Sequence, residues 1–229
     1  MSELSSITLF HFTDKLENLQ NILLSGLRSG LVSEKISGRN IAYFSEMICF
    51  CDIPLSKIKE HTKWYGKYAI GIRPDYLKEK GVSPVIYTHS RSPFLYKGES
   101  EKACSEFRSF PVLKYLKRCS GRQHKKHTEQ FESKRFIDER EWRIVSDSTA
   151  LVKRFKNLEE LKARTEKEKE NDLRKPFYVK ISPEEIEYIV VSSREELPIM
   201  VEWLMAHFPD SYQEYLPKML AYSQIERDF

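Results

Sequence analysis

The chain opens on a pattern that predicts a strand, a polar turn and a helix. Ile7, Leu9 and Phe10 form a β-favouring apolar run. Helical spacing then joins Leu16, Leu19, Ile22 and Leu23. Asp14 with Glu17 predicts an N-cap and its capping-box partner, and Gly26 predicts a left-handed C-cap. The first 27 residues therefore predict one strand–turn–helix unit.

The same signals recur along the rest of the chain. They predict strands at 41–53, 67–72, 84–88, 136–146, 177–181 and 187–191. They predict helices at 54–65, 75–80, 99–118 with a break at Pro111, 197–208 and 212–225. The Ser, Gly, Arg and Lys content of 28–40 predicts a loop. Since strands and helices do not alternate regularly, the fold class predicted is α+β.

Length and composition indicate a soluble globular chain. We expect a single domain over 1–229, with a charged helical excursion at about 153–175 and a C-terminal helical pair at about 196–226. No stretch approaches the roughly 18 apolar residues of a membrane span, and the N-terminus lacks a signal-peptide pattern. The four cysteines do not suggest a disulfide framework in a chain of 229 residues. We therefore expect a cytoplasmic protein with no membrane contact.

Two polar residues at the end of the first predicted strand are candidates for ligand binding. His11 and Thr13 precede the N-terminus of a helix, where backbone N–H groups attract anionic or polar groups. The alternative is structural: His11 satisfies a backbone carbonyl within a core element. The pattern alone leaves both interpretations open.

A second candidate is the charged run from Asp138 to Arg143. Alternation along a strand would place Glu139, Glu141 and Arg143 on one face and Trp142 on the other. Two carboxylates and a guanidinium on one face either line a cleft or form an ion-pair ladder on a surface. Packing of Trp142 on the opposite face favours the cleft.

A basic run follows residue 113. Its cations are Lys114, Lys117, Arg118, Arg122, Lys125 and Lys126. Clustered cations with interleaved aromatic residues suit DNA or RNA. The alternatives are a solvated loop or a surface that pairs with an acidic protein. The spacings of Cys and His match no tight zinc pattern, so we expect no metal site.

Three blocks carry a family resemblance. The stretches CFCDIPL at 49–55, YGKYAIG at 65–71 and DEREWR at 138–143 resemble the AbiGi-type abortive-infection proteins of bacteria. The opening His11-x-Thr13, with Asn18-Leu19, Ile22-Leu23 and Gly26-Leu27, resembles the DarT-like ADP-ribosyltransferases more distantly. This likeness implies an ADP-ribosyltransferase-like fold with a split mixed or antiparallel β-sheet core.

The transferase resemblance also implies a site for NAD. By it, Glu141 is the catalytic glutamate, and Glu139 completes a Glu-x-Glu spacing. The cofactor-binding positions that it implies are His11, Phe12, Thr13, Asn18, Tyr43 and Ser45. The chemistry would be cleavage of the nicotinamide glycosidic bond, with a carboxylate stabilising an oxocarbenium-like transition state. For the arginine that grips the NAD phosphates in that group, the sequence leaves three candidates open: Arg28, Arg39 and Arg73.

The AbiGi resemblance implies a role in phage defence. One interpretation is an enzyme that transfers ADP-ribose from NAD to a macromolecule, including DNA or RNA. The alternative is a non-catalytic, antitoxin-like binding module whose partner is a toxin protein. A metal-dependent nuclease using Asp138, Glu139 and Glu141 is a more distant third.

Overall fold

The structure is a computed structural model, and it divides the chain into two compact units. The first unit comprises residues 1–27, 50–80 and 179–229, and the second comprises 28–49 and 81–178. The described residues are 6–35, 41–89, 92, 111–124, 130–147, 151–154, 156–169 and 176–228.

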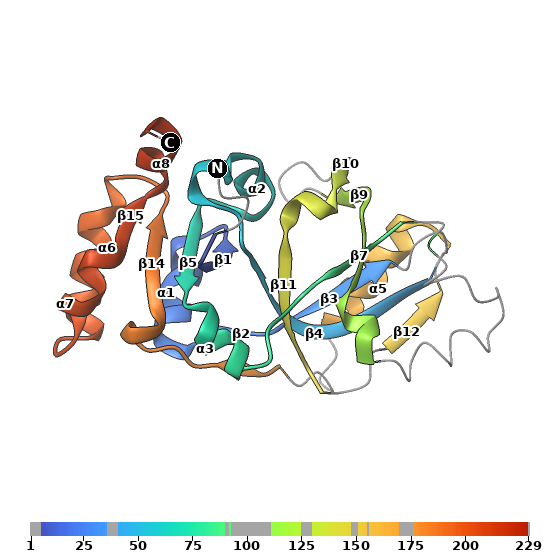
Figure 1. The fold of residues 1–229 in the computed structure, drawn as a ribbon, viewed down its shortest axis with the longest axis horizontal. Helices are drawn as coiled ribbons and strands as arrows, with labels where there is room; N and C mark the ends of the chain where they lie inside the picture. Colours follow the sequence, from blue (N-terminus) through green and yellow to red (C-terminus); the bar gives the residue numbers. More distant parts are fainter. Residues whose placement is uncertain are drawn as a thin grey trace. The chain divides into compact units, whose positions relative to one another are not determined.

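The first unit is built on a mixed sheet in the order β15–β14–β5–β1 (Figure 1). Its strands are β1 (Leu9–Thr13), β5 (Tyr68–Ile72), β14 (Ile186–Val191) and β15 (Met219–Ala221). The pairings are antiparallel except that of β14 with β15, which is parallel. Phe10 of β1 also pairs with Cys51, the last residue of β4 (Ile41–Cys51).

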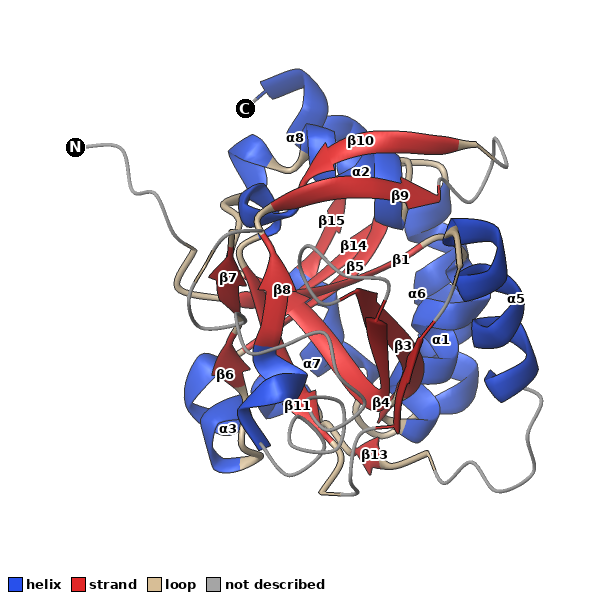
Figure 2. Ribbon diagram, turned by 90° about the vertical axis from the view of Figure 1, so that its right-hand side faces the viewer, coloured by secondary structure: helices blue, strands red, loops and turns tan. Residues whose placement is uncertain are grey.

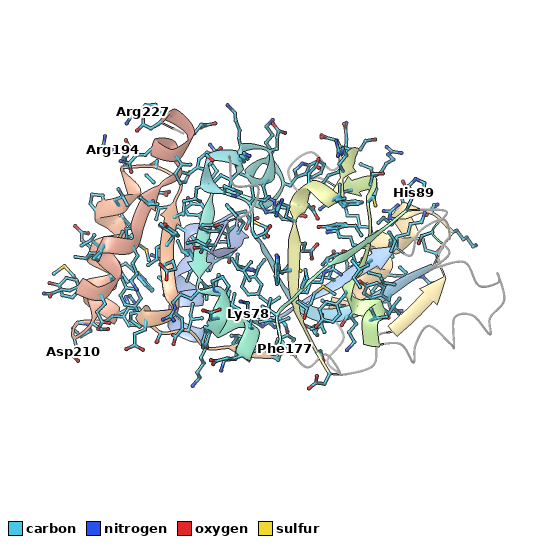
Figure 3. All side chains as sticks on the ribbon, in the orientation of Figure 1. Lys78, His89, Phe177, Arg194, Asp210 and Arg227 are labelled. Atoms are coloured by element: carbon cyan, nitrogen blue, oxygen red, sulfur yellow. The ribbon has the colours of Figure 1, made fainter. Side chains whose placement is uncertain are left out.

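Helices cover this sheet and bury its apolar side chains. They are α1 (Leu16–Ser25), α2 (Lys59–Tyr65), α3 (Pro74–Glu79), α6 (Glu196–His207), α7 (Tyr212–Tyr215) and α8 (Tyr222–Asp228), with the 3-10 turns η1 (Leu55–Lys57), η5 (Pro183–Glu185) and η6 (Leu216–Lys218). One core cluster joins Phe10, Ile58 and Val190 to Tyr222. Arg194, before α6, and Arg227 of α8 lie at one end of this unit, and Asp210 lies at the other (Figure 3).

The ends of α1 differ in part from the sequence prediction. Asp14 does not cap the helix: the N-cap is Lys15, without a side-chain bond, and Asp14 instead accepts a hydrogen bond from the Asn18 amide at 3.2 Å. Gly26 does close the helix, with a positive φ of 88° and an N–H that donates to Ile22 O at 2.8 Å. The capping-box prediction was therefore wrong, and the glycine prediction is confirmed in its positive φ.

The second unit contains most of the shorter strands. These are β3 (Gly30–Lys35), β4 up to Cys49, β6 (Ser83–Pro84), β7 (Ile86–Thr88), β8 (Leu116–Arg118), β9 (Ser120–His124), β10 (Phe131–Arg135), β11 (Glu141–Val145) and β12 (Leu151–Arg154). β3 and β12 pair antiparallel with β4, and β11 pairs antiparallel with β6. β11 also neighbours β4, where Ser146 N–H donates to Glu46 O at 3.0 Å.

Two further strand pairs and one helix complete this unit. β7 and β8 run parallel, and β9 and β10 form an antiparallel ribbon (Figure 2). The helix α5 (Leu158–Lys169) packs on β3, and the 3-10 turns η3 (Pro111–Tyr115) and η4 (Phe136–Glu139) precede β8 and β11. The short strands β2 (Leu27–Arg28) and β13 (Tyr178–Val179) lie where the chain passes from one unit to the other.

The core of the second unit surrounds β4. Tyr43 and Met47 of this strand pack with Leu113 and Leu116. A second cluster joins Ala42 and Phe44 to partly buried apolar side chains, among them Leu161 of α5. β4 is thus flanked by strands on both edges and buried on both faces, as its dense apolar run predicts.

The mixed α+β class is confirmed, but several predicted elements were wrong. Residues 30–35 of the expected loop form β3, because pairing with β4 satisfies their backbone despite a loop-like composition. The described part of the expected helix 99–118 is η3 and β8, and 99–110 lie outside the described residues. The expected last helix is interrupted by η6 and β15, where Pro217 cannot continue a helical ladder.

Candidate functional site: a buried ion network in the second unit

The residues that the sequence predicted for a site fall into two groups. His11, Phe12, Thr13 and Asn18 belong to the first unit. The second unit holds Tyr43, Ser45, Glu139, Glu141 and the basic run. The predicted meeting of His11 with Glu141 in one cleft stays a prediction.

In the first unit the polar and aromatic side chains at the end of β1 have neighbours of their own. Thr13 is 8% exposed, and its Oγ1 accepts a hydrogen bond from Asn18 Nδ2 at 3.0 Å. The ring of His11 lies edge-on to Phe50, with centroids 5.9 Å apart. Phe12 lies edge-on to His61, at 4.9 Å. Thr13 and Asn18, which the sequence placed together in a motif, do meet.

The acidic run of the second unit bends where the sequence predicted a continuous strand. Residues 136–139 form the turn η4, and Arg140 adopts a left-handed conformation with φ 48° and ψ 49° before β11 begins at Glu141. The strand prediction for 136–140 was therefore wrong. The predicted convergence of Glu139, Glu141 and Arg143 is nevertheless present. Lys117 contacts both glutamates, and Arg143 binds Glu141.

Arg143 lies at the centre and is 0% exposed. Its Nε donates to Glu141 Oε1 at 2.6 Å, and its Nη2 donates to Glu34 Oε1 at 2.6 Å. Its Nη1 donates to Tyr43 Oη and to the backbone oxygen of Lys114, each at 2.8 Å. Four bonds thus hold a guanidinium that water does not reach, which a buried cation requires.

Two lysines bind the remaining carboxylate oxygens. Lys117 Nζ contacts Glu139 Oε2, lies 2.6 Å from Glu141 Oε2 and 3.6 Å from Glu34 Oε1. Lys134 Nζ lies 2.5 Å from Glu139 Oε1. We call the set the ion network: Glu34, Lys117, Lys134, Glu139, Glu141 and Arg143. Its three carboxylates and three cations balance to zero formal charge.

The mutual contacts fix the protonation of this network. Burial alone would raise the pKa of Glu141, but Arg143 and Lys117 hold that pKa well below its usual range. Burial would likewise raise the pKa of Glu139, but Lys117 and Lys134 lower it. Burial lowers the pKa of Lys134 to about 8, with Glu139 opposing the shift. At neutral pH both glutamates are therefore charged.

Neutral polar groups close the network. Tyr43 is 1% exposed, and its hydroxyl donates to Leu116 O at 2.9 Å while it accepts from Arg143. Tyr87 Oη accepts the backbone N–H of Glu141 at 2.9 Å. Burial and the nearby Glu141 carboxylate raise the pKa of the Cys49 thiol. Ser45 is buried beside Glu46, and its Oγ donates to Glu46 O at 3.3 Å.

The described members of the basic run differ in exposure. Lys114 and Lys117 are each 7% exposed; Lys114 Nζ donates to Ser146 O, and Lys117 belongs to the ion network. Both amines are thus used inside the unit, and the assignment of these lysines to a nucleic-acid surface stays a prediction. Arg118 is half-buried and Arg122 is exposed. Lys125 and Lys126 lie outside the described residues.

Sequence reasoning missed two members of the network. Glu34 lies in the segment predicted as a loop. Lys134 lies in a run of mixed charge, and the hairpin of β9 and β10 determines which carboxylate it meets. In the described residues no group of three His, Cys, Asp or Glu side chains is placed to hold a metal ion. No helix among the residues that the structure describes is long and apolar enough to cross a membrane.

The arrangement suits a structural role better than proton transfer. A general base or a ribose-binding carboxylate must offer an oxygen to a substrate. Both oxygens of Glu141 are already engaged, one by Arg143 and the other by Lys117, and the residue is 7% exposed. A balanced and satisfied buried network fixes one arrangement of the surrounding strands.

Comparison with known proteins gives a family. The AbiGi family, described as an abortive phage resistance protein and antitoxin, matches residues 35–192. The abortive phage resistance protein AbiGi of Lactococcus lactis subsp. cremoris is 28% identical over 144 residues, which cover 49% of this chain and 57% of that protein. The chain thus spans less than two thirds of this relative. No solved structure matches it. The family match contains every residue of the ion network except Glu34.

Proposed function

The chain belongs to the AbiGi family of abortive phage resistance proteins, and from this membership we propose that it acts as an antitoxin-like binding module that neutralises a toxin protein. In this role the protein works by contact with its partner and needs no chemical step of its own. The ion network then serves to hold the second unit in a single conformation.

One observation carries the proposal. Glu141, the residue that the transferase resemblance marks as catalytic, has each carboxylate oxygen bound by a buried cation of the same unit. Releasing it for a substrate would leave Arg143 or Lys117 buried without a counter-ion, which is costly. A binding module has no use for a free carboxylate, so this arrangement suits it.

ADP-ribosyl transfer from NAD is the second candidate. The observation in its favour is that Tyr43 and Glu141, two residues that the resemblance assigns to the NAD site, bind the same guanidinium. For this activity Arg143 would have to release Glu141, so that the Glu141 carboxylate could bind the substrate. The two candidates differ in whether the chain alone harms a cell: a transferase toxin would, and an antitoxin would not.

Co-expression tests the proposal. The chain and the protein encoded beside its gene are placed under separate inducers in a bacterial host, and growth is followed with each alone and with both. We expect the neighbour alone to arrest growth and the chain to restore it. Glu141→Gln, expressed at the same level by immunoblot, should restore growth as well. Arrest caused by the chain alone, and relieved by Glu141→Gln, would overturn the proposal in favour of the transferase.

A further inference from the structure

The helix α6 of the first unit is apolar on the side that faces solvent as well as on the side that packs. It lies beside β15, the strand at one end of the sheet of this unit, and its Met200 and Leu204 are fully buried (Figure 1). On the exposed side, Ile199 is 53% exposed and Met205 is 48% exposed. A surface helix of a globular protein carries polar residues on that side. We call this exposed set the outer face of α6: Pro198, Ile199, Glu202, Met205 and Ala206.

Helical spacing brings these residues together as one patch. Ile199, Glu202 and Ala206 follow one another at intervals of three and four residues, which places them on one side of the helix. The half-buried Trp203, four residues after Ile199, borders the patch, and its ring stacks on His207 with centroids 4.4 Å apart. A contiguous apolar patch with a tryptophan at its border is typical of a surface that binds another protein.

The exposed charges near the outer face are acidic. From residue 194 to residue 214 the chain has five acidic residues and one basic residue, although its net charge is +4. Glu202 belongs to the face, Asp210 follows the helix, and Glu214 is exposed on α7, which packs against α6. Among the described residues, no lysine or arginine lies within ion-pair distance of these three acids. The basic residue, Arg194, lies at the opposite end of the unit from Asp210 (Figure 3). The patch thus combines apolar surface with uncompensated negative charge.

This negative charge decides which occupant suits the outer face. Two copies of the chain paired through it around a two-fold axis would bring Glu202 close to its own counterpart, and like charges at an interface oppose association. A partner surface that has an apolar centre and flanking lysines or arginines complements the face instead. The outer face of α6 therefore fits a partner protein whose own surface is basic.

We propose that the outer face of α6 binds the toxin, through an apolar patch of the toxin that is flanked by lysine and arginine. In the complex the apolar patch of the toxin covers Ile199 and Met205, and Glu202 pairs with a cation at the edge of that patch. This inference rests on the proposed antitoxin role, because it names the surface through which that role is carried out.

Binding of the protein encoded beside the gene to the full chain, measured by titration calorimetry, tests the surface. Met205→Glu removes an apolar contact from the outer face and keeps the negative sign of its charge. The matched control is Ile86→Glu, which makes the same kind of change at a residue of β7 that is 42% exposed. We expect Met205→Glu to weaken binding at least about tenfold, as the loss of a central apolar contact does, and Ile86→Glu to change it less than about twofold.

A second pair of variants tests the charge. Glu202→Lys reverses the charge within the outer face, and Glu79→Lys reverses that of an exposed glutamate of α3 in the same unit. We expect Glu202→Lys to weaken binding at least about tenfold at low salt, because it places like charges opposite each other. This deficit should shrink in about 1 M salt, where the Debye length falls to about 3 Å. Glu79→Lys should change binding less than about twofold.

The possible outcomes separate this surface from the antitoxin role itself. If the toxin binds the wild type and both face variants equally, the outer face is not the docking surface, whereas the antitoxin role stands. If the wild type does not bind the toxin, both proposals fail. Sedimentation velocity of the chain alone tests the other occupant: a dimer that Met205→Glu dissociates would show that a second copy covers the face, and would overturn the proposal. Circular dichroism checks that each variant is folded, and either face variant decides the test if the other does not fold.

Discussion

Arg143 and Glu141 share one face of β11 and bind each other at 2.6 Å, although neither is accessible to a partner outside the unit. The spacing of two residues along a strand places both side chains on the same side. Glu34 and Tyr43 then reach the same guanidinium from β3 and β4. The Arg143 guanidinium thus links three strands of the second unit, β3, β4 and β11.

The first prediction concerns the guanidinium. Arg143→Met should lower the free energy of unfolding by about 3–5 kcal/mol, because it removes the guanidinium that binds Glu34 and Glu141 and leaves the network with one uncompensated negative charge. Urea denaturation followed by circular dichroism measures the loss. The control is Arg122→Met, an exposed position, which should stay within about 0.5 kcal/mol of the wild type. Equal effects of the two variants would contradict the central place of Arg143.

The second prediction concerns acid. Glu139 and Glu141 have pKa values below their ordinary 4.5, so the folded state binds their protons less readily than the unfolded chain. Their contribution to stability is therefore complete above about pH 4.5 and is lost as the pH falls towards the folded pKa values.

Urea midpoints measured from about pH 3 to about pH 7 should fall at the acid end, and Glu141→Gln should fall less steeply because one of the two titrating groups is gone. The variant is less stable than the wild type at neutral pH, so the slopes are compared and not the absolute values. A wild type whose stability is flat down to about pH 3 is incompatible with the depressed pKa values.

The third prediction is a coupling between Lys117 and Glu139. Lys117→Met and Glu139→Gln each leave the buried network with one uncompensated charge, whereas the double variant removes one charge of each sign. The double variant should therefore lose less stability than the sum of the single losses, with a coupling of about 0.5–3 kcal/mol. A double-mutant cycle in urea measures it. Simple additivity would mean that the two groups do not pair in solution.

Local patterns predicted those parts of the protein whose contacts are short in sequence. The strand β4 follows from its apolar run, and the grouping of Glu141 with Arg143 follows from alternation along one strand. Even the wrong strand assignment at 136–140 left this grouping intact, because the bend at Arg140 precedes β11.

Contacts between distant segments could not be read in the same way. Nothing local in Lys117 tells a buried lysine from one on a basic surface; its burial depends on Glu139 and Glu141, which lie more than 20 residues later. Glu34 enters the network only because β3 pairs with β4, a pairing that the Ser- and Gly-rich composition concealed. The candidate site was thus half visible in the sequence: Glu139, Glu141 and Arg143 were grouped, Lys117 was assigned to a basic run, and Glu34 and Lys134 were missed.

The fourth prediction concerns the turn that closes α2 in the first unit. Gly66 has φ 100°, and a Cβ there would lie 2.2 Å from the backbone oxygen of Thr13. Gly66→Ala should therefore destabilise the chain by more than about 1 kcal/mol, since neither the backbone angle nor the space suits a side chain. Thermal unfolding measures it.

Gly30→Ala is the matched control, because a Cβ at Gly30 meets nothing within 4 Å and its φ is not positive. Its stability should stay within about 0.5 kcal/mol of the wild type. If both alanine variants behaved alike, the close approach of Gly66 to β1 would not exist in solution.

The proposed antitoxin role requires Glu141 to be a structural member of the ion network and not a catalytic carboxylate. Nicotinamide release from millimolar NAD by the purified wild type, followed by NMR with and without DNA or RNA, tests this most directly. We expect no release above that of buffer under any of these conditions. Steady release by the wild type that Glu141→Gln abolishes, with the variant folded by circular dichroism, would contradict it and would identify Glu141 as the carboxylate of an ADP-ribosyltransferase.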